Sequence, residues 1–328
     1  MTARAWAELL RISALFTVPG DALAGAAAAG RRPNRSTALA AGASLCLYEA
    51  GMALNDWADR EEDAVDRPHR PIPSGRITPR AALTAAGALT AAGLALAARA
   101  GRPALTVATG LAATVWAYDL RLKHTPAGPA AMAAARGLDL LLGATATATA
   151  PATAPAKASA AAAATALAPP PRSAVPAALP AAALLTAHTY AVTAVSRHEA
   201  QGGSTTAPLA ALTAVAALGG AVVRERPGET ARAGETKRAG EVKRATAPAR
   251  LLVTALTGAY LRTAGRPLAH AALNPSPPLT QRAVGGGIRA MIPLQAALAA
   301  RAGASGTALA VMGLVPLARS LSRKVSPT

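Results

Sequence analysis

The sequence predicts an all-α integral membrane protein with about nine transmembrane helices. Of its 328 residues, 52% are hydrophobic, and the mean hydropathy is +0.28. Aromatic residues make up only 2% of the chain, so the apolar content is mainly Ala, Leu and Val, and Ala is a good helix former. Several segments with few or no charged side chains approach the roughly 20 residues that a helix needs to cross a bilayer.

The expected spanning helices are the apolar segments of about this length. They lie near residues 6–29, 36–56, 79–99, 103–120, 128–149, 174–195, 204–223, 281–301 and 303–321. The first segment contains Pro19 and Asp21, and we expect it to be a spanning helix rather than a cleavable signal peptide. Residues 250–264 are apolar but short, so they could lie on the surface, cross partially or add a helix.

Two low-complexity segments interrupt what we expect to be a single polytopic membrane domain over residues 1–328. Residues 150–173 are mostly Ala, Pro and Thr, with three successive prolines, which is typical of an extended or disordered link. Residues 224–250 are charged and lack a hydrophobic face, which favours a solvated loop. We expect the segment 224–250 to be such a loop rather than a functional site.

The formal net charge is +18, from 34 Lys and Arg against 16 Asp and Glu. A basic balance indicates nucleic acid, anionic lipid or an anionic substrate as a partner. Aromatic side chains that could stack on bases are nearly absent, so we expect no nucleic acid. The lipid bilayer and a phosphate-bearing substrate fit better, because the basic residues gather at the ends of apolar segments.

The orientation in the membrane is not settled by the positive-inside rule, because basic residues flank the spans on both faces. The chemistry described next favours a cytoplasmic position for the connections 55–80, 120–127 and 196–203, in a cell membrane.

A row of carboxylates follows the second apolar segment. Asp56, Asp59 and Asp63 are spaced by three and four residues, so on a helix they share one face. Asn55 stands one turn before Asp59, and Asp66 continues the row. Like charges on one face repel and are costly beside a membrane unless a cation lies between them, and Mg²⁺ takes carboxylate and phosphate oxygens. The alternative is a solvated, charged interfacial loop.

Basic residues come directly after the carboxylates. Arg67 and Arg70 bracket the first proline of the segment 67–75, and guanidinium groups bind phosphate oxygens at two points. Pro71 to Gly75 cannot continue a helix and must form a turn. Carboxylates for a metal followed by arginines for phosphate is the arrangement expected for a diphosphate leaving group.

This stretch resembles the first motif of the UbiA superfamily of membrane prenyltransferases, Asn-Asp-x-x-Asp-x-x-x-Asp. The positions that match it are Asn55, Asp56, Asp59 and Asp63, and the continuation Arg67-Pro68-x-Arg70-Pro71-Ile72-Pro73-Ser74-Gly75 also resembles that family. Tyr118 and Lys123 are similar to the family's connection after the fourth helix, and Arg136 to Asp139 to the start of its fifth. The resemblance implies a nine-helix fold, a Mg²⁺-dependent site and an isoprenyl diphosphate donor.

The second Asp-rich motif of that family has no full counterpart here. The corresponding connection, residues 196–203, offers Glu199 as its one carboxylate and Arg197 as a phosphate contact. It resembles a divergent subgroup with Ser-Arg-x-Glu at this place. The implied metal ligands are Asp56, Asp59, Asp63 and Glu199. The implied catalytic residues are Asp56, Asp59, Asp63, Arg67, Arg70 and Lys123. The implied substrate-binding residues are Asn55, Asp66, Tyr118, Arg136, Asp139, Arg197 and Glu199.

Two functions are therefore expected. The first is Mg²⁺-dependent transfer of a prenyl group from an isoprenyl diphosphate to a small or lipophilic acceptor, which the sequence does not identify. The second is a catalytically silent membrane protein that binds or moves a lipid-linked diphosphate, and the single carboxylate at Glu199 is its support.

Overall fold

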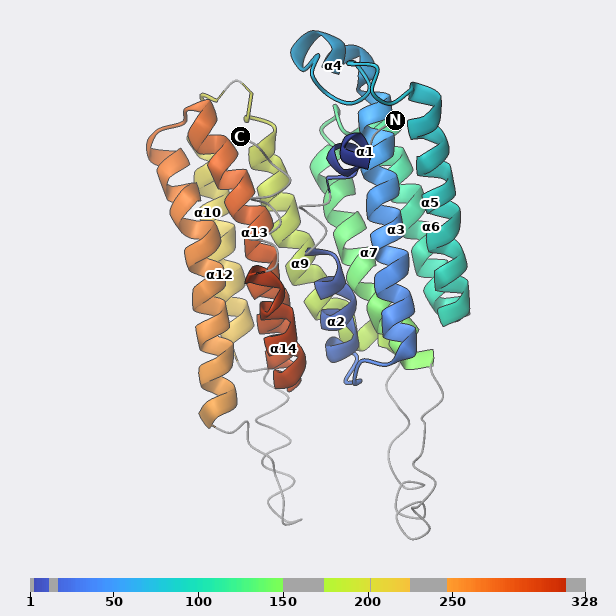
Figure 1. Cartoon of the computed structure of the whole chain (residues 1–328). Helices are drawn as coiled ribbons and strands as arrows, with labels where there is room; N and C mark the ends of the chain where they lie inside the picture. The colour runs from blue at the N-terminus through green and yellow to red at the C-terminus, as the bar shows by residue number, and fades with distance from the viewer. Residues whose placement is uncertain (1–2, 12–16, 150–173, 201, 225–246, 317–328) are drawn as a thin grey trace, which may run out of the picture.

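The computed structural model describes residues 3–11, 17–149, 174–200, 202–224 and 247–316, and within these ranges it contains helices and no strand (Figure 1). The elements in chain order are α1 (Ala3–Leu9), α2 (Pro19–Ala28), α3 (Arg35–Ala58), α4 (Arg60–Asp66), α5 (Pro79–Ala100), α6 (Arg102–Ala117), the π-helical turn η2 (Tyr118–Leu122), α7 (Gly128–Thr149), α9 (Ala174–Ser196), α10 (Thr206–Val223), α12 (Ala247–Leu273), α13 (Pro277–Arg301) and α14 (Ser305–Met312). The expected all-α class is confirmed.

The long helices run up and down side by side (Figure 1). Helix α5 packs on α3, α7 on α9, and α12 on α13. One buried cluster joins α2 and α7 to α9, α10, α12, α13 and α14, and a second joins α2 and α7 to α3, α5 and α6. Helices α2 and α7 therefore contribute to both clusters and connect the two sides of the bundle.

Close contact between α2 and α7 depends on two glycines. A Cβ atom on Gly143 would lie 2.4 Å from the Cα of Ala22, and one on Gly25 would lie 2.0 Å from the carbonyl oxygen of Leu140. Small residues at a helix interface let backbones approach closely in membranes. These glycines fix how near α2, with its buried Asp21, comes to α7.

The expected helix over 6–29 is wrong as a single element. The structure has α1 and α2 as separate helices, and Arg11 between them has a φ of +47°, outside the helical range. Pro19 stands in the first turn of α2, where its missing N–H costs nothing. The apolar composition of the whole segment concealed this break.

The segment near 250–264 is part of a helix, α12, that runs for 27 residues and packs on α10 and α13. Residues 247–250 therefore belong to a helix, so the expected loop over 224–250 is too long at its end. The rest of that expected loop, residues 225–246, and the expected link over 150–173 lie outside the described residues.

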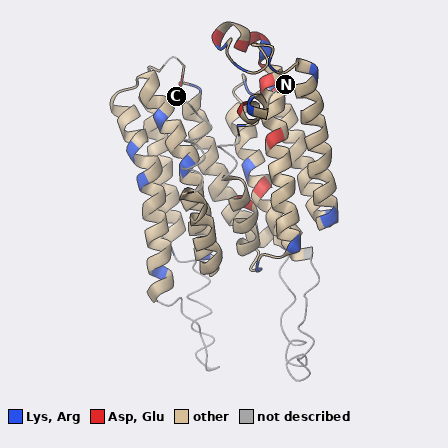
Figure 2. Cartoon of the chain, in the orientation of Figure 1, with Lys and Arg blue, Asp and Glu red and all other residues tan. Residues whose placement is uncertain are grey.

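Among the described residues, five helices are long and apolar enough to cross a membrane: α3, α5, α9, α10 and α13. The chain is thus a multi-pass membrane protein, while the count of nine spans stays a prediction. Figure 2 shows acidic residues, coloured red on the ribbon, concentrated toward one end of the bundle, in α4 and the adjoining part of α3.

Candidate active site

The carboxylate row lies where α3 ends and α4 begins. Asp59 is the residue between the two helices, with φ −87° and ψ 2°, and its N–H still bonds to the carbonyl oxygen of Asn55. The interruption at Asp59 divides the row, which the spacing placed on one continuous helix face.

Asp56 and Asp63 both bond to one guanidinium. Arg70 Nη1 lies 3.2 Å from Asp56 Oδ1 and 2.8 Å from Asp63 Oδ2. Arg11 Nη2 adds a contact of 3.3 Å to Asp56, and Arg67 lies 3.6 Å from Asp63. Both carboxylates are buried, and burial of a charge requires such a partner. Asp56 and Asp63 are therefore the ion-pair partners of Arg70 in this structure.

The proline turn holds Arg70 in place. The N–H and hydroxyl of Ser74 donate to the carbonyl oxygen of Arg70 at 3.0 and 2.6 Å. Arg76, which follows the turn, forms two bonds with the carboxylate of Glu8 in α1, at 2.6 and 3.0 Å. The Arg76 guanidinium holds the pKa of Glu8 below its usual range, so this pair is charged and ties α1 to the turn.

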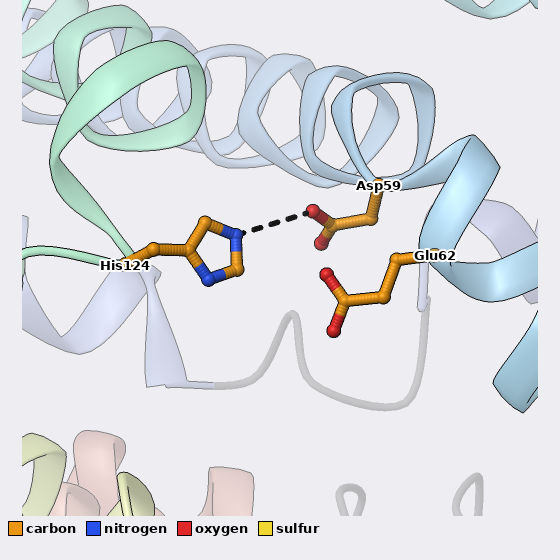
Figure 3. Close-up of side chains that lie close together, drawn as sticks. All are labelled: Asp59, Glu62 and His124. Carbon is orange, nitrogen blue, oxygen red and sulfur yellow. Dashed lines mark ion pairs between the residues drawn. The ribbon is translucent and has the colours of Figure 1, made fainter.

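Asp59 faces the connection after α6 (Figure 3). The ammonium of Lys123 contacts Asp59 Oδ1, and His124 Nε2 lies 3.8 Å from the same oxygen. Figure 3 shows the side chains of Asp59, Glu62 and His124 directed toward one another, and one ligand atom from each lies within 4.8 Å of the others. Two carboxylates and an imidazole are ligands that divalent metals take, so this donor set fits a divalent cation.

The turn η2 brings another carboxylate to the same region. Asn55 Nδ2 donates to Asp119 Oδ1 at 3.3 Å, and Asp119 is buried. A π-helical turn holds five residues where an α-helix would hold fewer, and such turns occur often at functional sites. Here it directs Asp119 toward α3 while Lys123, just after the turn, reaches Asp59.

A cavity of about 740 Å³ opens at this end of the bundle. Its polar and charged lining comprises Arg11, Ser44, Tyr48, Asn55, Asp59, Glu62, Arg67, Arg70, Tyr118, Asp119, Lys123, His124, Arg136, Asp139, Thr193, Ser196, Arg197, Glu199 and Gln281. Its apolar lining includes Leu47, Met52, Leu111, Val115, Met132 and Ala135. The three connections expected on one face, 55–80, 120–127 and 196–203, all supply lining residues.

A buried polar network lies toward the inner end of the cavity. Arg136 Nη1 is 2.5 Å from Asp21 Oδ2 and 3.9 Å from Asp139 Oδ2. Ser44 on α3 donates to Asp139, and Gln295 on α13 donates to Asp21 at 2.7 Å. The network joins α2, α3, α7 and α13 through one guanidinium.

The connection after α9, which begins at Ser196, contributes Arg197 and Glu199 to the cavity lining. Arg197 Nη1 donates to the carbonyl oxygen of Thr125 at 3.1 Å, which joins this connection to the one that carries Lys123. Glu199 is partly buried, and burial raises its pKa above the usual range. The structure thus brings all three connections to one cavity mouth.

The model of the UbiA prenyltransferase family matches residues 14–220. The chain belongs to the UbiA prenyltransferase family. It is 37% identical over 128 residues to a digeranylgeranylglyceryl phosphate synthase from Methanopyrus kandleri, a match that covers 38% of this chain and 45% of the relative. It is 33% identical over 148 residues to the enzyme of the same name from Halobacterium salinarum, covering 44% and 54%. The chain spans about half the length of these relatives.

Two solved structures share the fold. A UbiA homolog from Aeropyrum pernix K1 matches with a TM-score of 0.60 and 18% identity, over 87% of this chain and 96% of that one. A UbiA homolog from Archaeoglobus fulgidus, bound to GPP and Mg²⁺, matches with a TM-score of 0.57 and 20% identity, over 92% and 99%. The expected UbiA-like bundle is confirmed.

Most of the residues expected from the UbiA resemblance line this one cavity: Asn55, Asp59, Arg67, Arg70, Tyr118, Lys123, Arg136, Asp139, Arg197 and Glu199. Asp56 and Asp63 do not line the cavity, but both form ion pairs with the lining residue Arg70. Asp66 is exposed and is also absent from the lining. The metal set Asp56, Asp59, Asp63 and Glu199 stays a prediction.

Sequence reasoning missed five titratable residues of this UbiA cavity: Arg11, Tyr48, Glu62, Asp119 and His124. Glu62 and Asp119 stand inside stretches that the resemblance already singled out, so proximity to the motif was the available signal. His124 follows Lys123 directly. Arg11 carried no such signal, because its position depends on the break between α1 and α2.

Proposed function

We propose that this chain catalyses Mg²⁺-dependent transfer of a prenyl group from an isoprenyl diphosphate to a lipophilic acceptor in the membrane. The observation that carries the proposal is the cavity of about 740 Å³, with its charged mouth and apolar walls. The relatives named as digeranylgeranylglyceryl phosphate synthases and the homolog bound to GPP and Mg²⁺ support an isoprenyl donor. The acceptor is unassigned beyond its lipophilic class.

The cavity mouth has the charges that a diphosphate needs. Arg67, Arg70 and Lys123 line it together with Arg197 and offer N–H groups to phosphate oxygens. Mg²⁺, when bound among the carboxylates, would neutralise and polarise the diphosphate oxygens. Because these side chains are held by bonds such as Arg70 to Asp63, little reorganisation is needed as the diphosphate departs.

The cavity walls suit a prenyl chain. The lining residues on α3 run from Ser44 to Asn55, which corresponds to about 16 Å at the helical rise of about 1.5 Å per residue. Leu47 and Met52 lie on this length of α3, and Leu111 and Val115 face the same cavity from α6. Apolar walls keep water away from the allylic cation that forms when the carbon–oxygen bond to diphosphate breaks.

The organisation of the chain belongs to the same proposal. We place the cavity mouth on the cytoplasmic side of a cell membrane, because a water-soluble diphosphate donor would enter there. Lining residues that extend from Arg11 to Gln281 support one polytopic domain, since segments from most of the chain contribute to one site.

The test is release of diphosphate by the purified full chain in detergent, with Mg²⁺, a panel of isoprenyl diphosphates and membrane extract as the acceptor source. We expect release from the unsubstituted protein and at least a hundredfold loss in Asp59→Ala, the size of effect for losing one preorganised electrostatic partner. Glu61→Ala is the matched control, because Glu61 is 86% exposed and outside the cavity lining.

If no donor releases diphosphate while a radiolabelled donor still binds in a Mg²⁺-dependent manner, the catalytically silent binding protein is the better account. Full turnover in Asp59→Ala would refute the assignment of the cavity mouth.

A further inference from the structure

The cluster of Asp59, Glu62 and His124 offers more than a set of carboxylates. The three side chains come from two segments, the α3–α4 junction and the connection after η2, and they converge at the cavity mouth (Figure 3). Imidazole nitrogen is a ligand for first-row transition ions, whereas Mg²⁺ prefers an all-oxygen shell. The composition of the cluster therefore bears on which ion it binds.

We propose that Asp59, Glu62 and His124 form a divalent-metal site in which His124 makes the cavity mouth prefer Mn²⁺ over Mg²⁺. The inference rests on the proposed function in one respect, that the ion serves the donor diphosphate. It assigns Glu62 and His124 as ligands, neither of which belongs to the row of carboxylates expected from the sequence.

The geometry allows a common ion. The ligand atoms lie within 4.8 Å of one another, slightly wider than the roughly 4.2 Å between opposite ligands of a six-coordinate ion with bonds of about 2.1 Å. The side chain of His124 is 68% exposed and Glu62 is exposed, so both have room to close on the ion. Asp59 is held in place by Lys123 and provides the fixed side of the site.

Three other carboxylates near the mouth are less exposed than Asp59, which itself contacts Lys123. Asp56 and Asp63 are buried against Arg70, and Asp119 is buried and accepts a bond from Asn55. Glu199, the carboxylate that the connection 196–200 offers, is partly buried and is not part of this cluster. Glu62 and His124 thus supply the donors that this connection lacks.

The experiment is a binding titration of the purified full chain in detergent, without donor. Mn²⁺ binding is followed by electron paramagnetic resonance, with Mg²⁺ as competitor, and the spin-echo modulation of bound Mn²⁺ reports any coordinated nitrogen. We expect one nitrogen-coordinated Mn²⁺ that Mg²⁺ displaces only at more than about tenfold higher concentration. In His124→Ala the nitrogen signal should disappear and Mn²⁺ affinity should fall at least about tenfold.

Matched controls separate ligands from neighbours. His69→Ala removes an exposed histidine of the proline turn that does not line the cavity, and Glu61→Gln is the partner control for Glu62→Gln. We expect both controls to bind Mn²⁺ as the unsubstituted protein does and Glu62→Gln to bind it at least about tenfold more weakly.

Two results would overturn the inference: Mn²⁺ bound without a nitrogen signal in the unsubstituted protein, or a preference for Mn²⁺ over Mg²⁺ that His124→Ala leaves unchanged. Glu62→Gln gives an independent reading if His124→Ala folds poorly. The proposed function is measured separately by diphosphate release. A nitrogen-coordinated Mn²⁺ in a protein without turnover would leave the metal site standing and refute the transferase.

Discussion

Replacing Gly143 by Ala tests the contact between α2 and α7 on which the inner cavity depends. The new Cβ would lie 2.4, 2.5 and 2.8 Å from the Cα, O and C atoms of Ala22, and ordinary van der Waals contact begins at 3.4 Å. Because these are backbone atoms, α2 as a whole must move by about 1 Å. Overpacking of this kind costs about 1–3 kcal/mol, against a gain of about 0.5–1 kcal/mol from replacing a helical glycine.

The centres of these two ranges, about 2 and about 0.8 kcal/mol, leave a net loss of about 1 kcal/mol, which corresponds to a melting midpoint lower by roughly 2–4 °C. The assay is thermal unfolding of the purified protein in detergent, followed by circular dichroism at a fixed scan rate. Gly87→Ala is the matched control, because no atom lies within 4 Å of its added Cβ, and it should be as stable as the unsubstituted protein or slightly more so. Equal midpoints for the two variants would refute the close-contact argument.

Three further predictions concern charges and hydrogen bonds. Arg11→Ala removes a guanidinium from the cavity lining, so it should raise the donor KM about tenfold, equivalent to about 1.4 kcal/mol. The melting midpoint should change little, and an unchanged KM would contradict the prediction. Asp21→Asn should destabilise the fold by about 1.5–3 kcal/mol, because Arg136 loses the nearer of its two buried carboxylates and keeps Asp139, and unfolding in denaturant measures the loss. Tyr260→Phe should cost about 1 kcal/mol in the same measurement, since its hydroxyl lies 3.0 Å from His188 Nδ1, and diphosphate release should be unaffected.

The fold class and most of the cavity lining were predictable from the sequence, because both rest on local patterns. Apolar segments of spanning length predict helices, and the stretch from Asn55 to Gly75 carries its chemistry within 21 neighbouring residues. Lys123 and Arg197 were predictable because they follow spanning segments that end on the same face.

What the sequence could not supply depends on contacts between distant segments. The division of the carboxylate row at Asp59 involves Lys123, 64 residues away, and Arg70, which holds Asp56 and Asp63 together. Arg11 donates a hydrogen bond to Asp56, 45 residues away in the sequence. This contact is possible because α1 and α2 are separate helices and Arg11 lies just after α1. Helix periodicity contains no information about such pairings, so it assigned Asp56, Asp59 and Asp63 one common role.

The π-helical turn at Tyr118–Leu122 determines the direction in which the side chains between it and α7 point around the helix axis. Deleting one residue of this turn would restore a continuous α-helix and rotate the next side chains by about 100° around the axis. Lys123 and His124 would then lose their contacts with Asp59, although every residue of the carboxylate row would still be present. A chain of this family could thus lose its cavity mouth through a change of length alone, without substitution of any residue that contacts the donor.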